Sequence, residues 1–367
     1  MKIIICCNHS WPHIGGTEKV VKQISTSMSE KYGHDVFVIS RSLLKPIKDG
    51  KISMIPCARD PLSFLRQIQA LKPDHTFVYS DCFSFWSTIV DNAEKIPGKK
   101  SIALVGMNYM LSRRNIFNTF KNKKDQFQIV THSDNYQDYK GCTDFGLQVT
   151  VIPNGINLSE FDKEVSNPLP EKFKDKKIIL CVSNFFPGKG QEQLVEVANR
   201  LSRKRDDFVV VFISSTVNFF YAQVLSSKVQ GLLKKASFPF LFLKDISRDQ
   251  VIGYFLSSNI FAFPTQKEVA PVVVLEAMAC KIPWVSMPVG NTRLLKGGLL
   301  VPYSTKDKDG YALYDEQSYT VFADHLFNIL ENRDLKTSLG ESGYQQIIED
   351  YNWEKIERQY NDLFSVT

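Results

Sequence analysis

The chain has 367 residues, of which 43% are hydrophobic and 23% are charged, and this ordinary globular composition excludes a disordered, collagen-like or low-complexity protein. No run approaches the roughly 20 consecutive apolar residues that a membrane span requires. Lys and Arg outnumber Asp and Glu by six, and the whole excess lies in residues 1–160. This imbalance indicates an anionic partner for the first half, although a solvated basic face would account for it equally well.

The first half of the chain opens with a β-loop-α-β pattern. Residues 2–7 form a short, continuous apolar run that is typical of a buried parallel strand. A loop with two glycines and then a helix from Thr17 follow, and residues 35–39 form the next predicted strand. Further strands are predicted at 76–79, 101–105, 127–131 and 149–152. Such alternation predicts a parallel sheet with right-handed crossovers.

The second half repeats this plan after a polar, proline-bearing segment, residues 158–175, which is predicted to be a linker. Strands are predicted at 177–182, 208–213, 240–243, 260–263 and 283–286, and the tail from about residue 318 is helical. We therefore predict two α/β domains of similar plan that share a cleft, because parallel sheets bind ligands at the carboxyl ends of their strands.

Seven cysteines are spread along the chain without a C-x-x-C pair or a Cys/His cluster. Their odd number and scattered positions predict reduced thiols, and they give no support to a metal site. The apolar run at the N-terminus is too short for the core of a signal peptide. We therefore expect a cytoplasmic protein that holds no metal.

Two glycine-bearing loops follow predicted strands and precede predicted helices. Gly15 and Gly16 would let the backbone approach a ligand closely at a helix N-terminus, or they serve only the turn. Lys189 lies between two glycines, where it could reach a phosphate, although an exposed turn lysine is equally compatible with the pattern. Neither loop is a G-x-G-x-x-G or Walker A motif, which disfavours a dehydrogenase.

A third strand-loop-helix segment, Phe263 to Cys280, carries two glutamates eight positions apart, Glu268 in the loop and Glu276 in the helix. Pro271 favours the first helical position, so the N–H groups of Val272 and Val273 would be available to a diphosphate. Glu276 could accept hydrogen bonds from two hydroxyls, or it could simply be stabilised by the helix dipole.

Taken together, these motifs resemble the retaining glycosyltransferases of family 4. The resemblance covers nearly the whole chain in the right order, and its most specific part is Glu268 followed by Leu275-Glu276-Ala277-Met278-Ala279. Supporting parts are Gly15-Gly16 with Glu18, Gly33-His34, the turn Ile152 to Asn157, and Lys189-Gly190. The family implies the GT-B fold: Rossmann-like domains over 1–160 and 161–345, facing a central cleft, with a C-terminal helix of about 345–367 packing back on the first.

The resemblance also implies a nucleotide-sugar donor, with UDP or GDP as the nucleotide, and assigns roles within its site. Glu276 would bind the ribose hydroxyls, Glu268 the hydroxyls of the sugar, and Lys189 with the Val272 and Val273 amides the diphosphate. Ile246 would lie near the base, and Gly15 and Gly16 would approach the donor from the other domain. Lys189 and Glu268 are the predicted catalytic residues, and neither a cofactor nor a metal is expected.

The chain departs from the family pattern at three places. Asn184 stands where the family usually has an arginine, and Lys281 stands where it has a glycine. Where many members carry a histidine in the first domain, this chain has Gly106-Met107-Asn108. Asn108 and His132 are therefore the candidate acceptor-side residues, although His132 could equally be an ordinary polar loop histidine.

The acceptor is predicted to be a lipid-linked saccharide or a surface glycan at the inner face of the plasma membrane. Residues 111–124 combine apolar and basic side chains, which is typical either of a segment lying on an anionic bilayer or of a helix packed on the sheet. No nucleic-acid motif accompanies the charge, so no nucleic acid is expected. A binding protein without turnover and a nucleotide-sugar epimerase are the alternative functions.

Overall fold

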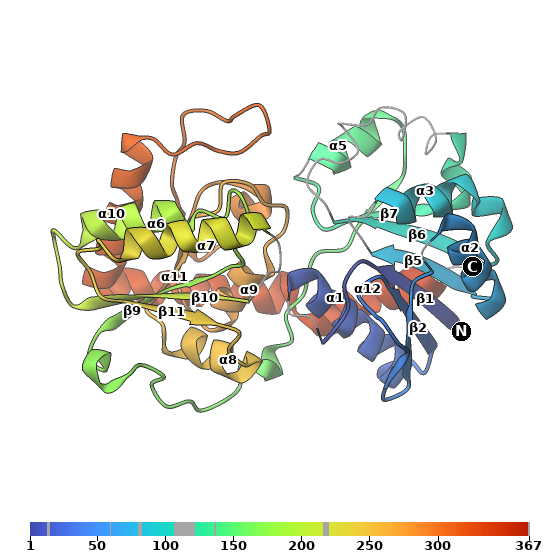
Figure 1. Ribbon diagram of the computed structural model, residues 1–367, viewed down its shortest axis with the longest axis horizontal. Helices are drawn as coiled ribbons and strands as arrows, with labels where there is room; N and C mark the ends of the chain where they lie inside the picture. Colours follow the sequence, from blue (N-terminus) through green and yellow to red (C-terminus); the bar gives the residue numbers. More distant parts are fainter. Residues whose placement is uncertain are drawn as a thin grey trace. The chain divides into compact units, whose positions relative to one another are not determined.

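The computed structural model describes residues 1–12, 15–58, 60–79, 83–105, 122–135, 137–215 and 220–365. The chain forms two compact units (Figure 1). Unit 1 comprises Met1–Gly155 and Trp353–Thr367, and unit 2 comprises Ile156–Asn352. These divisions lie a few residues from the predicted boundaries at 160 and 345. Among the described residues, no helix combines the length and the apolar character needed to cross a bilayer.

Unit 1 is built on an eight-stranded sheet with the order β3-β4-β2-β1-β5-β6-β7-β8. All neighbouring strands are parallel except β3 and β4, which pair antiparallel at one edge. The strands are β1 Lys2–Cys7, β2 Asp35–Ser40, β3 Ile47–Asp49, β4 Ile52–Pro56, β5 His75–Tyr79, β6 Lys99–Leu104, β7 Gln128–Thr131 and β8 Val149–Val151. The short strands β3 and β4 were not predicted from the sequence.

Helices cover both faces of the unit 1 sheet. They are α1 Gly16–Thr26, α2 Pro61–Leu71, α3 Phe83–Asp91, α5 Gln137–Asp144 and α12 Trp353–Ser365, with the short helices η1 Ser27–Lys31, η2 Ala93–Lys95 and η3 Lys124–Gln126. Apolar residues of α2, α3 and α5 form one core cluster with the sheet. On α12, the rings of Tyr360 and Phe364 lie 5.9 and 5.5 Å from the ring of Phe77 on β5. The last helix therefore belongs to the core of unit 1.

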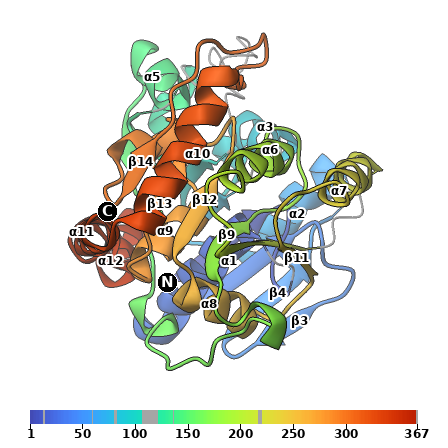
Figure 2. The same cartoon turned by 90° about the vertical axis from the view of Figure 1, so that its left-hand side faces the viewer.

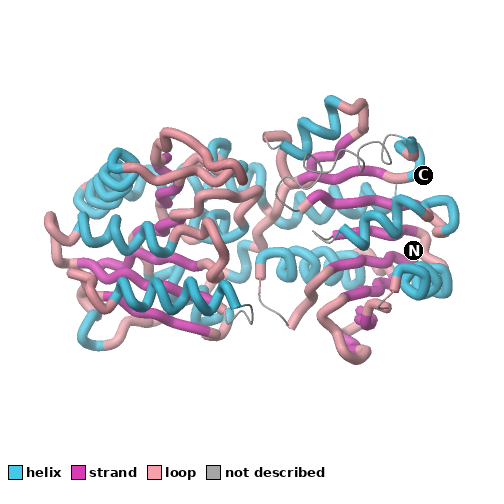
Figure 3. Tube along the Cα trace, turned by 45° about the horizontal axis from the view of Figure 1, so that its top comes forward, coloured by secondary structure: helices cyan, strands magenta, loops and turns pink. Residues whose placement is uncertain are grey.

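Unit 2 is built on an all-parallel sheet of six strands with the order β11-β10-β9-β12-β13-β14. The strands are β9 Lys177–Val182, β10 Phe208–Ser214, β11 Phe240–Lys244, β12 Ile260–Phe263, β13 Trp284–Ser286 and β14 Gly298–Leu300. The four central strands, β9, β10, β12 and β13, are mostly buried and rich in Ile, Val, Leu and Phe, as strands covered on both faces require, whereas the edge strands β11 and β14 are largely half-buried. Figure 3 shows the strands of each unit in magenta with helices packed against them.

The helices of unit 2 also lie on both faces of its sheet. They are α6 Gln191–Leu201, α7 Phe220–Leu233, α8 Arg248–Ser257, α9 Val272–Ala279, α10 Glu316–Glu331 and α11 Arg333–Gln346, with the short helices η4 Leu158–Glu160, η5 Glu171–Phe173, η6 Gly290–Leu294 and η7 Ile347–Tyr351. Helices α6, α7 and α10 share one apolar cluster with the sheet. Figures 1 and 2 show α8 on the opposite face from α6 and α7.

The segment predicted as a linker, residues 158–175, packs on unit 2 instead. Phe161 and Leu169 are both 7% exposed. The hydroxyl of Tyr254 on α8 donates a hydrogen bond of 3.2 Å to the carbonyl of Pro168. Polar composition and prolines predicted a linker here, but these buried side chains and this hydrogen bond hold the segment on the domain that follows it.

Candidate functional site

Two loops of unit 2 meet where the strand order of its sheet reverses. β9 lies between β10 and β12, so the loops that follow β9 and β12 leave the sheet side by side at its carboxyl edge. The backbone N–H of Gln266 in the second loop donates a hydrogen bond of 2.7 Å to the carbonyl of Gly188 in the first. Open parallel sheets bind ligands at such a point.

The first loop ends at Gly190, which is the N-cap of α6 and has a φ of 78°. A Cβ atom at this position would overlap the carbonyl oxygen of Pro264 in the second loop. Both the backbone conformation and the close approach therefore require glycine here. This contact fixes the position of Lys189, the residue immediately before it.

Lys189 and Glu268 are brought together by the two loops. The Lys189 Nζ lies 2.5 Å from Glu268 Oε2, and the two side chains are 22% and 17% exposed. Glu268 Oε1 accepts a 3.1 Å hydrogen bond from the backbone N–H of Val269. An ammonium has three donors, and within the described part of the chain Glu268 is the only group that the Lys189 ammonium contacts. Two donors therefore remain for a ligand.

Helix α9 begins at the end of the second loop and one residue later than predicted. Pro271 is its N-cap rather than its first helical residue, because a ψ of 112° is extended. The backbone N–H groups of Val272 and Val273 are in the first turn and have no hydrogen-bond partner among the described residues. Such N–H groups, with the positive end of the helix dipole, form a site suited to an anion.

Glu276 is on the second turn of α9 and is only 3% exposed. The Nη2 atom of Arg248, the first residue of α8, lies 2.7 Å from Glu276 Oε1. The same Nη2 lies 2.9 Å from Glu160 Oε2, and the guanidinium lies 5.6 Å from the ring centre of Phe161. Burial alone would lower the pKa of Arg248, but the carboxylates of Glu276 and Glu160 outweigh it and raise that pKa.

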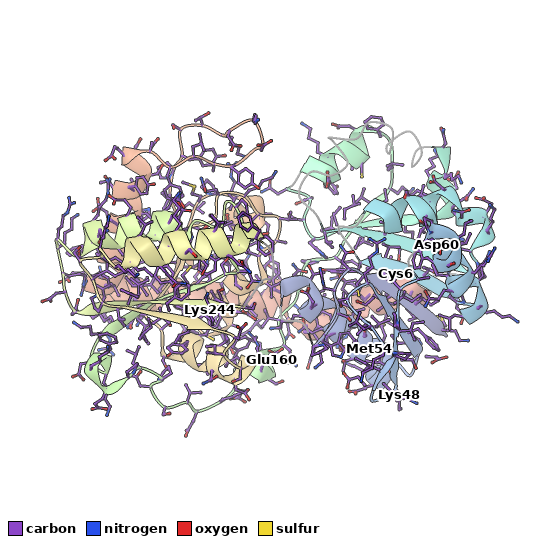
Figure 4. All side chains as sticks on the ribbon, viewed as in Figure 1. Cys6, Lys48, Met54, Asp60, Glu160 and Lys244 are labelled. Carbon is purple, nitrogen blue, oxygen red and sulfur yellow. The ribbon has the colours of Figure 1, made fainter. Side chains whose placement is uncertain are left out.

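Arg248 and Glu160 were not among the site residues predicted from the sequence. Figure 4 labels Glu160, whose side chain lies beside the start of α8. One indication was present, because a cation at the first position of a helix opposes the helix dipole. Such a residue needs a nearby carboxylate, but only the fold shows which carboxylates are in reach.

Asn184 lies in the first loop, and Ile246 lies in the loop after β11 at the same edge of the sheet. The side-chain oxygen of Asn184 accepts hydrogen bonds from the backbone N–H and the hydroxyl of Ser215, at 3.0 and 2.7 Å. Asn184 therefore connects the loop after β9 to the end of β10. Ile246 is half-buried in the turn between β11 and α8, next to Asp245, which has a φ of 52°.

A segment before α10 supports the second loop from outside. The Gln266 amide donates a 2.8 Å hydrogen bond to the carbonyl of Ala312. The Lys267 ammonium donates a 2.7 Å hydrogen bond to the carbonyl of Asp309, and it lies 5.1 Å from the ring centre of Tyr311. Lys267, one residue before Glu268, is therefore occupied away from the Lys189–Glu268 pair.

The remaining predicted site residues belong to unit 1. Gly15 is the N-cap of α1 and Gly16 is its first residue. His132 follows β7 and is 4% exposed, with Nε2 2.7 Å from the Tyr79 hydroxyl and Nδ1 2.9 Å from the carbonyl oxygen of Ile152. Burial lowers the pKa of His132 to about 4. These partners favour a structural role for this histidine, and Asn108 lies outside the described residues.

No group of three or more His, Cys, Asp or Glu side chains in the described ranges is arranged to hold a metal ion. None of the six described cysteines is in a disulfide bond. Burial raises the pKa of Cys7, Cys142 and Cys181 to about 12. These thiols therefore stay protonated at neutral pH.

Comparison with known proteins decides the family. Residues 162–346 match the model of the glycosyl transferases group 1. The chain belongs to the group 1 glycosyltransferases. That match covers the whole candidate site of unit 2 except Glu160, and the family-level prediction from the Glu268–Glu276 block is confirmed.

Relatives of this group 1 glycosyltransferase have low sequence identity. A probable sucrose-phosphate synthase of Thermosipho melanesiensis is 24% identical over 255 residues, which is 68% of this chain and 53% of the relative. A GDP-mannose-dependent alpha-(1-6)-phosphatidylinositol monomannoside mannosyltransferase of Mycobacterium tuberculosis is 21% identical over 254 residues, 65% of this chain and 62% of the relative. The matched region thus spans somewhat more than half the length of these two relatives.

Solved structures of similar fold include Anabaena Alr3699/HepE in complex with UDP-glucose, with a TM-score of 0.76, 14% identity and full coverage of both chains. At this identity the likeness concerns the fold alone. The prediction of two parallel-sheet α/β domains of the GT-B type is confirmed by this likeness and by the two sheets.

Proposed function

We propose that this group 1 glycosyltransferase transfers a hexosyl group from a UDP- or GDP-sugar to a saccharide acceptor. The observation that carries the proposal is the Lys189–Glu268 ion pair at the switch point of the unit 2 sheet. This pair is in the loops that lead into α6 and α9, and two first-turn amides of α9 have no partner in the described part of the chain. A cation and helix-terminal N–H groups suit a diphosphate, and a carboxylate suits the hydroxyls of a sugar.

Each group of the site takes one part of the donor. The amides of Val272 and Val273 and the ammonium of Lys189 bind the diphosphate, whose charge they offset. Glu268 accepts hydrogen bonds from the sugar, and Glu276 accepts them from the ribose. Ile246 lies against the base. The UDP-glucose bound to Anabaena HepE and the GDP-mannose dependence of the mycobacterial relative support a nucleotide-sugar donor.

Transfer proceeds with retention of configuration. The bond between the anomeric carbon and the diphosphate oxygen breaks, and the acceptor oxygen forms its bond to that carbon on the same face. The acceptor proton passes to an oxygen of the departing diphosphate. Lys189 and the α9 amides stabilise the charge that develops on this diphosphate, so the protein contributes positioning and electrostatics. We expect turnover to persist in excess EDTA, because these groups offset the charge of the diphosphate that a metal ion would otherwise offset.

The acceptor proposed is a lipid-linked saccharide or a surface glycan at an anionic membrane. The phosphatidylinositol mannoside acceptor in the name of the mycobacterial relative supports it. So does a basic hairpin in unit 1, in which Lys45, Lys48 and Lys51 are exposed and Leu44 is 97% exposed. Residues 111–124, the predicted membrane segment, lie mostly outside the described residues. Sedimentation with anionic vesicles at low salt is the test, and absence of binding would count against this acceptor class.

A thermal-shift screen of UDP, GDP, ADP and their sugars tests the donor. A ligand at 100 times its dissociation constant adds about 2.7 kcal/mol of stability, and we expect this from UDP or GDP compounds. Glu276→Gln should reduce the shift, whereas Lys267→Met, which changes a cation outside the pair, should leave it intact. If no nucleoside diphosphate or nucleotide sugar stabilises the protein, the proposal is wrong.

A binding protein without turnover is the second candidate, and Asn184 favours it. The side chain of Asn184 is neutral and bonded to Ser215, so it supplies no charge at the place where an arginine was expected. Incubation with the stabilising nucleotide sugar separates the two functions. Transfer to water or to any acceptor would exclude the binding protein, and an intact donor with and without acceptors would exclude the transferase.

A further inference from the structure

We propose that Arg248, held in place by Glu160, is a positioning residue that keeps Glu276 ionised and oriented toward the ribose of the donor. The inference rests on the proposed function, because it assigns a ribose to Glu276. It goes beyond that function in adding two residues, from the start of α8 and from η4, that act through Glu276 and need not touch the donor.

Glu276 lies in apolar surroundings. Glu276 is 3% exposed, and the other residues of α9 are all apolar: Val272, Val273, Val274, Leu275, Ala277, Met278 and Ala279. Moving a carboxylate into such surroundings is costly unless a cation and hydrogen bonds compensate. A neutral, protonated Glu276 would accept fewer hydrogen bonds from hydroxyls than the ion does. A cation at this place therefore has a direct effect on ribose binding.

Arg248 is held in a fixed geometry beside Glu276. The side chain of Ser247 and that of Gln250 form a capping box, which fixes the backbone where α8 begins. From there the guanidinium places Nη2 2.7 Å from Glu276 Oε1. Nε and Nη2 lie 3.3 and 2.9 Å from Glu160 Oε2. Contacts to two carboxylates hold the planar group in one orientation, which a lysine could not reproduce.

The charges of Arg248, Glu160 and Glu276 do not cancel. Two carboxylates and one guanidinium leave the cluster with a net charge of −1. Arg248 contacts Oε1 of Glu276; because a carboxylate has two oxygens and about four acceptor sites, this contact does not use the whole acceptor capacity of Glu276. Arg248 also follows the predicted base residue Ile246 by two positions. One side chain thus connects the loop near the base with the carboxylate for the ribose.

The test measures how strongly each protein distinguishes ribose from deoxyribose. Isothermal titration calorimetry gives the dissociation constants of UDP, GDP, 2′-deoxy-UDP and 2′-deoxy-GDP. The variants are Arg248→Ala, Arg248→Lys, Glu160→Gln, Glu276→Gln and the double variant Arg248→Ala/Glu276→Gln. Arg200→Ala is the matched control, because Arg200 also pairs with two carboxylates, Glu196 and Glu316, and lies 5.0 Å from the ring centre of Tyr319.

We expect the wild type to prefer the ribonucleotide by about tenfold, the value of one charge-assisted hydrogen bond. The preference should fall toward unity in Glu276→Gln and Arg248→Ala and recover only in part in Arg248→Lys. Glu160→Gln, a near-isosteric change at a 28% exposed side chain, should reduce it about twofold to threefold. Adding Arg248→Ala to Glu276→Gln should change the preference no further, because Arg248 acts through Glu276.

The inference would be overturned if Arg248→Ala lost affinity equally for ribo- and deoxyribonucleotides, total loss of binding included. It would also be overturned if the preference for the ribonucleotide were unchanged in both Arg248→Ala and Glu160→Gln. A further fall in preference in the double variant would also overturn it. In these cases wild-type binding of UDP or GDP leaves the proposed function standing. If the wild type binds none of the four nucleotides, the proposed function fails and the inference fails with it.

Discussion

Replacing Lys189 by methionine removes the cation of the proposed diphosphate site while keeping a side chain of similar length. The ammonium lies 2.5 Å from Glu268 and is 22% exposed, so it is neither freely hydrated nor fully buried. In the wild type it would share its three donors between Glu268 and the leaving diphosphate. In the variant the developing charge on the diphosphate would be opposed only by the α9 amides.

The expected magnitude follows from this partial burial. Two unit charges 4 Å apart interact by about 4 kcal/mol at an effective dielectric constant of 20, and desolvation cancels part of it. Removing one donor that stabilises a developing oxyanion costs about 100-fold to 1,000-fold in turnover. We expect the lower end, about 100-fold, which corresponds to about 2.7 kcal/mol. An exposed ion pair would instead contribute only about 0–1 kcal/mol.

The assay is steady-state release of the nucleoside diphosphate from the donor that the thermal-shift screen identifies. The loss should be mainly in kcat, because the interaction grows as the diphosphate leaves. Lys267→Met is the matched control: its ammonium contacts the Asp309 carbonyl, and we expect less than about a threefold change. Equal activity of Lys189→Met and Lys267→Met would show that Lys189 does not stabilise the leaving diphosphate and is not part of the site.

Three further predictions concern stability. Gly190→Ala should lower the free energy of unfolding in urea by more than the roughly 1 kcal/mol expected of Gly146→Ala. Both glycines have positive φ, but only at Gly190 would an added Cβ also overlap the Pro264 carbonyl. Equal losses in the two variants would show that the overlap is relieved. Burial lowers the pKa of His132 to about 4, so the folded chain binds fewer protons than the unfolded chain between pH 4 and 6.5. The free energy of unfolding of the wild type should therefore fall as the pH drops through this window. In His132→Asn this fall should be smaller by roughly 3 kcal/mol. Superimposable pH profiles of the two proteins would contradict the burial of a neutral imidazole. The buried Tyr360 hydroxyl has no hydrogen-bond partner among the described residues, so Tyr360→Phe should raise the urea-derived free energy of unfolding by about 1 kcal/mol and Tyr360→Ala should lower it by about 3–5; a loss in Tyr360→Phe would reveal a partner for the hydroxyl.

The sequence predicted most of the two sheets because buried parallel strands are continuous apolar runs. Residues 2–7 and 177–182 were found at the bounds of β1 and β9. The strands β3, β4 and β14 were missed; β3 and β14 have only three residues, which give no periodicity to detect, and β4 has five. The end of the chain was predicted as one helix, but η7 ends at Tyr351 in unit 2 and α12 begins at Trp353 in unit 1.

The candidate site was predicted where residues close in sequence carry it, and was incomplete where they do not. Glu268 and Glu276 belong to one loop and helix, so their resemblance to one family motif indicated a shared site. The ion pair of Lys189 with Glu268 joins residues 79 positions apart, and only the adjacency of β9 and β12 brings them together. Arg248 was missed for the same reason, since its partners Glu160 and Glu276 come from two other elements.

The most direct measurement is a crystal structure of the protein with the stabilising nucleoside diphosphate bound. We expect diphosphate oxygens within hydrogen-bond distance of the Val272 and Val273 N–H groups and of the Lys189 ammonium, with a ribose hydroxyl on Glu276. A nucleotide bound elsewhere, with the Lys189–Glu268 pair and the start of α9 unoccupied, would contradict this expectation.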